Sequence, residues 1–451
     1  MKLILSTLLA ILLLPQIIEA QPKLDVLVSF IPWQSAGANP YGGLTLGKNG
    51  DFYGTTADGN NDVGTVFKLT TTGTLTTLAT FNYTNGANPL AGLTLGRDGN
   101  FYGTTYNYGV GGTVFRVTPE GSLTTLTNFN GTNGAYPMAA LTLGQDRNFY
   151  GTTSGGGSYG FGTVFRVTPE GNLTTLATFN GTNGAYPMAA LTLGRNHKFY
   201  GTTSGGGSYG CGTVFQMSAE GNLTTLATFN GTNGTYPTAT LALGNGSDFY
   251  GTTQFGGLNT NEYGSGFGTV FRVSPEGNLI TLANFDGTNG AYPQAGLTLA
   301  SDGVFYGTTF GGGYNNGNIY RVTASGKLDT VVSFSGTNGS WPMSSLTIGK
   351  DGNFYGTTEE GGSSYNGESV GVGTVFKLII PPTIKCFSLS NHVPIVSISS
   401  LEHTSVQIQT STNLLLPWSV LTNLILTEGT NEFSDFAHTN SPARFYRIIV
   451  N

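Results

Sequence analysis

The five-residue sequence Phe-Tyr-Gly-Thr-Thr occurs seven times in this chain, at intervals of about fifty residues. The seven copies begin at Phe52, Phe101, Phe149, Phe199, Phe249, Phe305 and Phe354. Leucine-rich and β-helix repeats are much shorter, and helical repeats require a hydrophobic period of about 3.6 residues, which this chain lacks. The repeat therefore favours an array of small β-sheets.

One unit, residues 187–229, contains four short segments with strand-like composition that are separated by turn residues. We predict strands at Ala189–Leu193, Phe199–Thr203, Thr213–Ser218 and Leu223–Phe229. Asp-Gly and Pro-Glu-Gly turns recur between the strands, and glycine permits the positive φ that tight hairpins need. Four antiparallel strands in each of seven copies predict an all-β fold, a seven-bladed β-propeller of four-stranded blades. We expect the Phe of each FYGTT segment to be buried between blades.

The two ends of the repeat region complement each other. The seventh unit stops after its third strand, at Leu378, and Pro381-Pro382 follow. The sequence LDVLVSF at Leu24–Phe30 nearly repeats LDTVVSF at Leu328–Phe334, which is the fourth strand of the sixth unit. We therefore predict that the N-terminal strand completes the seventh blade and closes the ring, which leaves no open sheet edge.

The remaining segments define the domain organisation. Residues 1–20 have a lysine near the start, an apolar core and a terminal alanine, which predicts a secretory signal peptide. No cysteine follows directly and no later apolar stretch is long enough to span a membrane, so we expect a secreted or cell-surface protein without a lipid anchor. Residues 21–380 form the predicted propeller. Residues 381–451, with alternating segments at Ser405–Thr410 and Phe445–Val450, predict a small β-sandwich-like domain.

The charge composition excludes several classes of partner. Only 9% of residues are charged and the net charge is −6, so the chain has no basic stripe for nucleic acid or for an anionic membrane surface. Cys211 and Cys386 lack a nearby His or Cys pattern, and the sequence leaves open whether they pair. We expect a monomer that carries no cofactor and no metal.

The repeated motifs resemble a known family. The segments FYGTT, GTVFRVTPEG and LTTLATF recur together in this order, as in the Gloeo/Verruco repeat family of exported bacterial proteins. The resemblance covers about Leu24–Leu378 and implies a β-propeller in a surface or extracellular setting, without an activity or functional residues to carry over. IQTSTNL and ARFYRI, at Ile408–Leu414 and Ala443–Ile448, are similar to short β-rich C-terminal modules of such bacteria.

The titratable residues form no recognisable catalytic pattern. A calcium site needs several converging oxygens, whereas each Asp-Gly turn supplies one acid. The four histidines are scattered, and one glutamate recurs in the Pro-Glu-Gly type of turn, at Glu120, Glu170, Glu220 and Glu276, where we expect it to be solvated. We predict no catalytic residue and no metal site. Two distant carboxylates that meet in space would instead indicate a carbohydrate-active enzyme, a hydrolase or a lyase, especially if acids cluster at the central channel.

The aromatic loop residues are the better functional candidates. In antiparallel blades, the loops after the second and fourth strands emerge on the same face, and the insertions Asn259–Gly264 and Ser363–Val370 belong to that face. We predict a ligand site centred on Trp341, with Tyr292, Tyr314 and Tyr365 around it. Alternatively, each aromatic residue packs within its own loop. The resulting hypothesis is a secreted, non-catalytic propeller that binds a glycan or a protein surface.

Overall fold

The structure is a computed structural model that describes residues 21–31, 37–59, 63–106, 111–260, 264–312, 315–365, 371–390, 393–401, 404–411, 418–427, 429–434 and 445–450. The chain divides into two compact units, one of Lys23–Ile379 and one that contains Ile380–Asn451. The regular elements of the described residues are all strands, and no helix among them is long and apolar enough to cross a membrane. The predicted signal peptide at residues 1–20 lies outside the described residues and stays a prediction.

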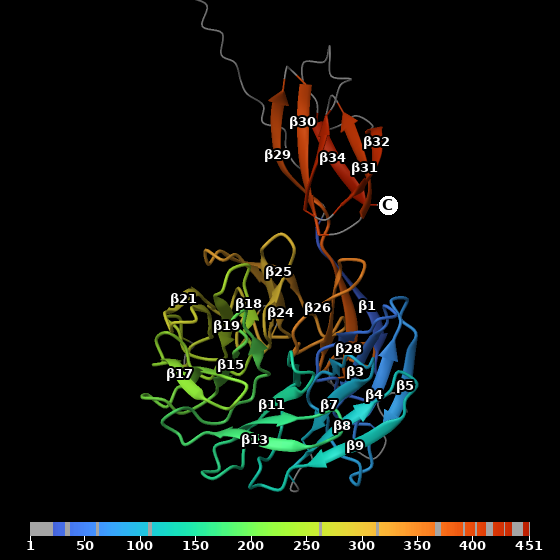
Figure 1. Cartoon of the computed structure of the whole chain (residues 1–451). Helices are drawn as coiled ribbons and strands as arrows, with labels where there is room; N and C mark the ends of the chain where they lie inside the picture. The colour runs from blue at the N-terminus through green and yellow to red at the C-terminus, as the bar shows by residue number, and fades with distance from the viewer. Residues whose placement is uncertain are drawn as a thin grey trace, which may run out of the picture. The chain divides into compact units, whose positions relative to one another are not determined.

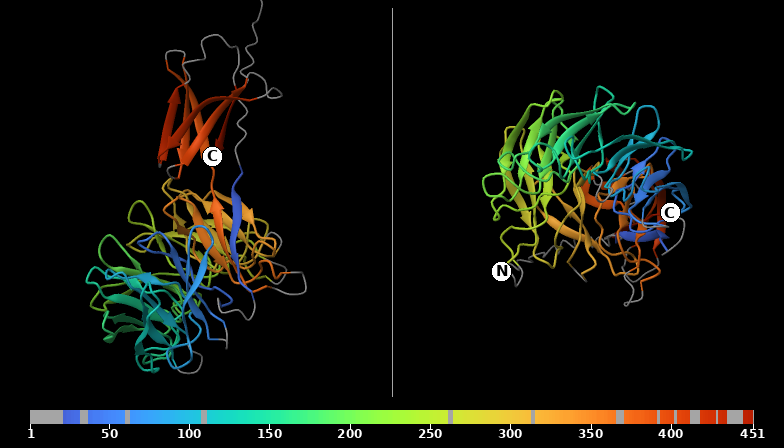
Figure 2. Two further views of the ribbon diagram at one scale, coloured as in Figure 1. Left: turned by 90° about the vertical axis from the view of Figure 1, so that its right-hand side faces the viewer. Right: turned by 90° about the horizontal axis from the view of Figure 1, so that it is seen from below.

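The first unit is the predicted seven-bladed propeller, with seven antiparallel four-stranded sheets that follow one another around the ring in chain order (Figures 1 and 2). The first strands lie innermost, and several of them contact the first strand of a neighbouring blade. They are β2 (Thr45–Leu46), β6 (Thr94–Leu95), β10 (Thr142–Leu143), β14 (Thr192–Leu193), β18 (Ala242–Leu243), β22 (Thr298–Leu299) and β26 (Thr347–Ile348). The second strands are the FYGTT segments β3 (Phe52–Thr56), β7 (Phe101–Thr105), β11 (Phe149–Thr153), β15 (Phe199–Thr203), β19 (Phe249–Thr253), β23 (Phe305–Thr309) and β27 (Phe354–Thr358).

The outer half of each blade is formed by the third and fourth strands, which are as long as the second strand or longer. The third strands are β4 (Thr65–Leu69), β8 (Thr113–Val117), β12 (Thr163–Val167), β16 (Thr213–Met217), β20 (Thr269–Val273), β24 (Asn318–Val322) and β28 (Thr374–Ile379). The fourth strands are β5 (Leu75–Thr80), β9 (Leu123–Asn128), β13 (Leu173–Thr178), β17 (Leu223–Thr228), β21 (Leu279–Asn284), β25 (Leu328–Ser333) and, from the other end of the chain, β1 (Lys23–Ser29).

The first strand of each blade is shorter than the sequence predicts. In blade 4 the prediction was Ala189–Leu193, whereas β14 contains only Thr192 and Leu193. The preceding backbone is bonded to neighbouring blades instead: the carbonyl of Ala189 accepts the Thr152 hydroxyl at 3.0 Å. On the other side, the N–H of Ala190 donates to Oγ1 of Thr240 at 3.2 Å. Side chains of other blades therefore replace the sheet partner that a longer strand would need.

The ring closes as predicted. Strand β1 pairs antiparallel with β28, with Leu24 opposite Leu378 and Val26 opposite Phe376. One residue beyond β1, the N–H of Phe30 donates to the carbonyl of Gly373 at 3.0 Å. The seventh sheet thus has the order β1-β28-β27-β26, and the N-terminal strand supplies its outer edge.

Aromatic stacking holds each blade against the next. The Tyr of every FYGTT segment lies on the Phe of the following segment, with ring centroids 4.0 to 4.5 Å apart, and Tyr355 on Phe52 completes the circle. Phe149 is only 1% exposed and packs with Tyr102 of the preceding blade, which confirms the predicted burial between blades. All five residues of each second strand are buried because both faces of the strand are blade interfaces.

Hydroxyl groups add a second circle of bonds between blades. The first Thr of each FYGTT segment donates to a backbone carbonyl of the next blade, as Thr55 does to Ala91 at 2.8 Å. The last member, Thr357, donates to the carbonyl of Gly42 at 3.2 Å and so connects blade 7 to blade 1. These buried hydroxyls are satisfied only when a neighbouring blade is present, so the bonds favour the complete ring.

The second unit contains two three-stranded antiparallel sheets, which fits the predicted β-sandwich-like domain. Their orders are β29-β30-β33 and β32-β31-β34. The strands are β29 (Thr383–Ser390), β30 (Val393–Ser400), β31 (Thr404–Ser411), β32 (Ser419–Leu426), β33 (Gly429–Ser434) and β34 (Phe445–Val450). Side chains from both sheets, including Val396, Ile398, Val406 and Ile408, form its buried core.

Candidate functional site

The loops after the second and fourth strands of the blades meet on one face of the ring, as the antiparallel order requires. In blade 4, Ala185 of the incoming loop forms an antiparallel bridge with Gly205 of the glycine-rich loop. The next residue, Tyr186, donates its N–H to the carbonyl of Phe161 in blade 3 at 2.8 Å. We call the surface formed by these loops, such as residues 180–187 and 204–212, the glycine-rich face.

The residue before the repeat proline has an unusual backbone conformation in every blade. Its φ lies between 52° and 60° at Asn39, Asn88, Tyr136, Tyr186, Tyr236, Tyr292 and Trp341. Asn tolerates this left-handed conformation, whereas a Tyr or Trp adopts it at a cost in free energy. Backbone bonds fix it: in blade 7, Trp341 donates its N–H to Asn316 and accepts the N–H of Glu359. The aromatic side chains are therefore presented from a rigid backbone.

Aromatic rings continue along this face from blade 5 to blade 7. Phe255 lies between Tyr236 and Tyr292, with ring centroids 5.9 and 5.4 Å away. Phe310 donates its N–H to the carbonyl of Tyr292, and its ring is stacked on Trp341 at 5.0 Å. We call these five residues the aromatic arc. Tyr236 is 48% exposed, so the arc is accessible at this end.

Two of the four predicted site residues belong to the aromatic arc. Both contact Phe310, Trp341 through its ring and Tyr292 through its backbone carbonyl, and both are half-buried. Tyr365 packs on the fourth-strand loop of blade 6, since a Cβ added to Gly336 would lie 2.5 Å from its ring. Tyr314 lies outside the described residues. Trp341 stacks on Phe310, which belongs to the glycine-rich loop of blade 6 and not to the loop of Trp341 itself, and the ligand site stays a prediction.

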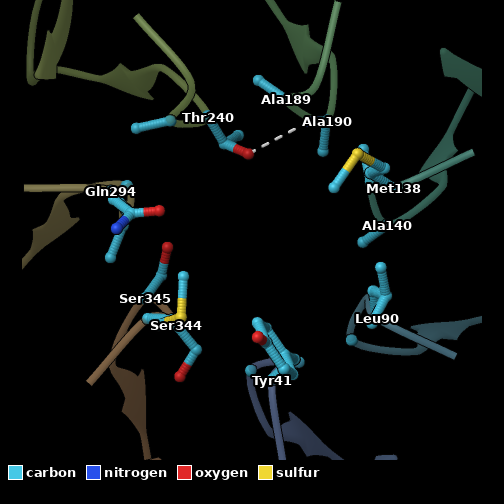
Figure 3. Close-up of a pocket in the computed structure, with 18 of the residues that line it drawn as sticks. Tyr41, Leu90, Met138, Ala140, Ala189, Ala190, Thr240, Gln294, Ser344 and Ser345 are labelled. Atoms are coloured by element: carbon cyan, nitrogen blue, oxygen red, sulfur yellow. Dashed lines mark hydrogen bonds between the residues drawn. The ribbon is translucent and has the colours of Figure 1, made fainter. Parts of the chain in front are cut away.

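A cavity of about 520 Å³ lies at the start of the first strands, surrounded by all seven blades (Figure 3). The residue after the repeat proline lines it in every blade: Tyr41, Leu90, Met138, Met188, Thr238, Gln294 and Met343. The residue two positions further on also lines it: Gly43, Gly92, Ala140, Ala190, Thr240, Gly296 and Ser345. We call this cavity the channel mouth. Tyr236 of the aromatic arc also lines it, so the channel mouth and the arc adjoin.

The sequence interpretation missed the channel mouth, although the repeat contains a signal for it. Proline and leucine flank a stretch of three residues without change, while the first and third of these three differ in size and polarity from blade to blade. Such variation inside an otherwise repeated motif indicates residues that face something other than the next blade.

The channel mouth is apolar on the side of blades 2 to 4 and more polar on the side of blades 5 to 7, where Met343 is an apolar exception. Leu90, Met138, Ala140 and Ala190 lie together on one side, and Thr240, Gln294 and Ser345 lie opposite them (Figure 3). The amide of Gln294 and the hydroxyl of Ser345 point into the cavity. None of the described residues that line the cavity carries a charge.

Glu359, which is hydrogen-bonded to the lining residue Tyr41, and its neighbour Glu360 do not line the channel mouth themselves. Burial raises the pKa of Glu359, and the charge of Asp58 adds to this, while a hydrogen bond with Tyr41 acts in the opposite direction. Burial, together with the neighbouring charge of Glu359, raises the pKa of Glu360 to about 7. Both residues directly follow the FYGTT segment of blade 7, where blade 1 closes the ring.

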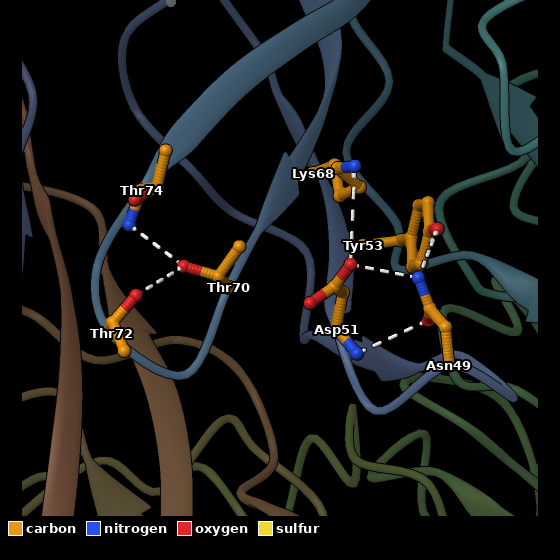
Figure 4. A network of polar contacts seen from close by, with 7 residues as sticks. All are labelled: Asn49, Asp51, Tyr53, Lys68, Thr70, Thr72 and Thr74. Carbon is orange, nitrogen blue, oxygen red and sulfur yellow. Dashed lines mark hydrogen bonds and ion pairs between the residues drawn. The ribbon is translucent and has the colours of Figure 1, made fainter.

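On the opposite face, the turn acids are engaged by their own hairpins. Oδ2 of Asp98 accepts hydrogen bonds from Tyr102 at 2.8 Å and Asn100 at 2.7 Å. Although burial opposes it, these bonds hold the pKa of Asp98 below its usual value. In blade 1, Asp51 contacts Asn49 and Lys68 in a similar network (Figure 4). These contacts show that the recurring aspartates form hydrogen bonds and ion pairs that stabilise their own hairpins.

The recurring turn glutamates are exposed, as expected for solvated residues. They are Glu120, Glu170, Glu220 and Glu276. Within the described ranges, no group of three or more His, Cys, Asp or Glu side chains is arranged to hold a metal ion.

Comparisons with known proteins agree with this architecture. A sequence profile of the Gloeobacter/Verrucomicrobia repeat matches residues 16–198 and 192–376. No curated protein sequence matches the chain significantly.

Solved structures share the fold at low sequence identity. A lectin from Burkholderia pseudomallei is 12% identical, with a TM-score of 0.52 over 81% of this chain and 96% of the lectin. A copper-bound fungal alcohol oxidase of the AA5 family is 12% identical, with a TM-score of 0.51 over 95% of this chain and 92% of the oxidase. The extracellular domain assigned to a hybrid two-component system of B. thetaiotaomicron is 11% identical, with a TM-score of 0.52 over 96% of this chain. This chain spans 58% of that domain's length.

Proposed function

This chain belongs to the Gloeobacter/Verrucomicrobia repeat family, and we propose that it is a non-catalytic binding propeller that recognises a glycan or a protein. The observation that carries the proposal is the channel mouth on the glycine-rich face, a cavity of about 520 Å³ with uncharged walls. Small-molecule pockets have volumes of about 300–1,000 Å³ and combine apolar walls with a few polar groups. The predicted signal peptide supports action outside the cell.

The aromatic arc supplies the second part of the proposed binding surface. Flat rings suit the apolar face of a sugar and the apolar centre of a protein interface. We place the aromatic contact at Trp341, with Tyr292, Tyr314 and Tyr365 around it. Trp341 and Tyr292 belong to the aromatic arc, which adjoins the channel mouth at Tyr236, and this supports the placement. The strained backbone at Trp341 and Tyr292 supports a role for their side chains beyond chain turning.

A carbohydrate-active enzyme on the same ring is less well supported. Glycoside hydrolysis uses two carboxyl groups that flank the scissile bond. The lining residues of the channel mouth, all within the described part of the chain, provide none. Glu359 and Glu360 have raised pKa values, but they lie outside the lining, and Glu359 is engaged with Tyr41.

A glycan-array screen of the full chain followed by fluorescence titration tests the proposal. In a Trp33→Phe, Trp418→Phe background, the emission reports Trp341 alone, because the chain has three tryptophans. We expect a bound ligand to change this emission and Trp341→Ala to weaken binding at least tenfold. Ile280→Ala, on the outer strand of blade 5, is the control and should bind normally.

The outcomes separate the alternatives. A ligand that binds without changing the Trp341 emission, and with full affinity for Trp341→Ala, would contradict the aromatic site. Cleavage of a glycan that is lost in Glu359→Gln or Glu360→Gln would contradict the non-catalytic assignment.

A further inference from the structure

We propose that the channel mouth binds an acetamido group, and that the partner carrying it is the end of a neutral glycan with N-acetylated sugars. This inference rests on the proposed binding function and assigns a ligand class to it. It is carried by the division of one cavity into an apolar and a polar side, which the sevenfold repeat does not require.

The apolar side fits a methyl group. Leu90, Met138 and Met188 come from consecutive blades, and the small residues Ala140 and Ala190 leave space between them. Methionine side chains are flexible and polarizable, so they adapt to a small apolar group. A sugar that carries only hydroxyls would leave this side of the cavity without a matching group.

The polar side fits the amide portion of the same group. The Gln294 carboxamide points into the cavity and provides both a donor and an acceptor, which an acetamido N–H and C=O can satisfy together (Figure 3). The hydroxyl of Ser345 also points inward, where it can donate to or accept from a sugar hydroxyl.

Charge and shape restrict the ligand further. The uncharged lining disfavours a free amine or a carboxylate, because burial of an unpaired charge is costly. Acetylation removes the charge of an amino sugar and supplies the methyl and amide groups at the same time. Since all seven blades surround the cavity, a chain end can enter it, whereas a polymer cannot cross it from side to side.

Calorimetric titration of the full chain with three trimers tests the inference. They are the β-1,4-linked trimers of N-acetylglucosamine, of glucose and of glucosamine. We expect the N-acetylglucosamine trimer to bind at least tenfold more tightly than either of the others. An acetyl-lysine peptide serves as a second source of the acetamido group, and we expect it to bind more weakly than the N-acetylated trimer.

Variants connect this binding to the two sides of the cavity. Gln294→Leu removes the amide at similar size, Gln294→Glu introduces a charge, and Ala140→Leu fills the apolar side. Each should weaken binding of the N-acetylated trimer at least tenfold, while Ile280→Ala should not. Thermal unfolding of each variant identifies those that fold normally, and the two Gln294 variants provide independent tests.

Several results would overturn the inference. Equal binding of the glucose trimer would show that the acetamido group is not recognised, and tight binding of the acetyl-lysine peptide alone would exclude the glycan. Unchanged affinity in the Gln294 and Ala140 variants would exclude the channel mouth. If the N-acetylated trimer does not bind while another ligand binds and loses affinity in Trp341→Ala, this inference is wrong and the proposed binding function stands.

Discussion

Two positions of the same repeat have opposite properties. The first Thr of FYGTT is identical in all seven blades, and each copy, such as Thr152, donates to a carbonyl of the next blade. The residue after the repeat proline differs widely, from Tyr41 and Met138 to Gln294, and it lines the channel mouth. The repeat is uniform where a blade must bond to another blade, and it varies where a side chain faces the cavity.

The largest expected effect tests the uniform part. Deletion of Leu24–Phe30 should remove the outer strand of blade 7 and expose the edge of β28. We expect loss of cooperative thermal unfolding, or aggregation. Val26→Ala is the control and should cost less than about 1 kcal/mol, since Val26 is 38% exposed. A truncated chain that melts like the parent would refute closure by the N-terminal strand.

A matched pair of substitutions compares the two regions directly. Phe149→Ala should lower the free energy of unfolding by about 3–5 kcal/mol, because the ring is buried between blades. Met138→Ala should cost less than about 1 kcal/mol, because this side chain is half-buried at the cavity. Chemical denaturation measures both values. Similar costs for the two variants would show that the cavity residues also hold the ring together.

A hydrogen bond from the first strand to the next blade that is missing in one blade predicts a smaller change in the free energy of unfolding. Six blades begin the first strand with Thr, whose hydroxyl donates to a Leu carbonyl of the next blade, as Thr192 does to Leu241 at 2.5 Å. Blade 5 has Ala242 at this position. We expect Ala242→Thr to raise the free energy of unfolding by about 0.5–1.5 kcal/mol, and Thr192→Ala to lower it similarly. Destabilisation by Ala242→Thr would mean that the position faces the cavity rather than blade 6.

The smallest effect concerns pH. The folded-state pKa of Glu360 is raised from 4.5 to about 7, so the folded protein binds more protons than the unfolded chain between these values. Its contribution to stability therefore falls as pH rises through this window. The lowered pKa of Asp98 and Asp146 acts in the opposite sense, and their contribution is lost as pH falls below about 3.8.

Thermal unfolding between pH 5 and pH 8 measures this dependence. We expect the parent chain to lose thermal stability toward pH 8, and the Glu359→Gln, Glu360→Gln double variant to lose less. An identical pH dependence in both proteins would contradict the raised pKa values. The difference between the two proteins also measures how much of the pH dependence of stability comes from these two glutamates of blade 7.

Much of the fold could be predicted because the repeat states it seven times. The FYGTT segments, the Asp-Gly turns and the match between Leu24–Phe30 and Leu328–Phe334 gave the blade number, the strand order and the closure of the ring. Burial of Phe149 followed from the same pattern, because a strand whose two faces both carry apolar rings must lie between two sheets. The repeat is sufficient for these features, since each follows from contacts that recur from blade to blade, including the pairing of Leu24 with Leu378 that completes blade 7.

The channel mouth was decided by the tertiary structure. Its lining residues are about fifty positions apart, and each one alone resembles an ordinary loop residue after a proline. Only the closed ring brings Leu90, Met138 and Gln294 around one cavity and gives it an apolar and a polar side. The raised pKa of Glu360 also depends on the tertiary structure, because burial, its largest cause, exists only in the folded protein. The sequence determines the ring through contacts that repeat, and the ring then determines which non-repeating side chains meet.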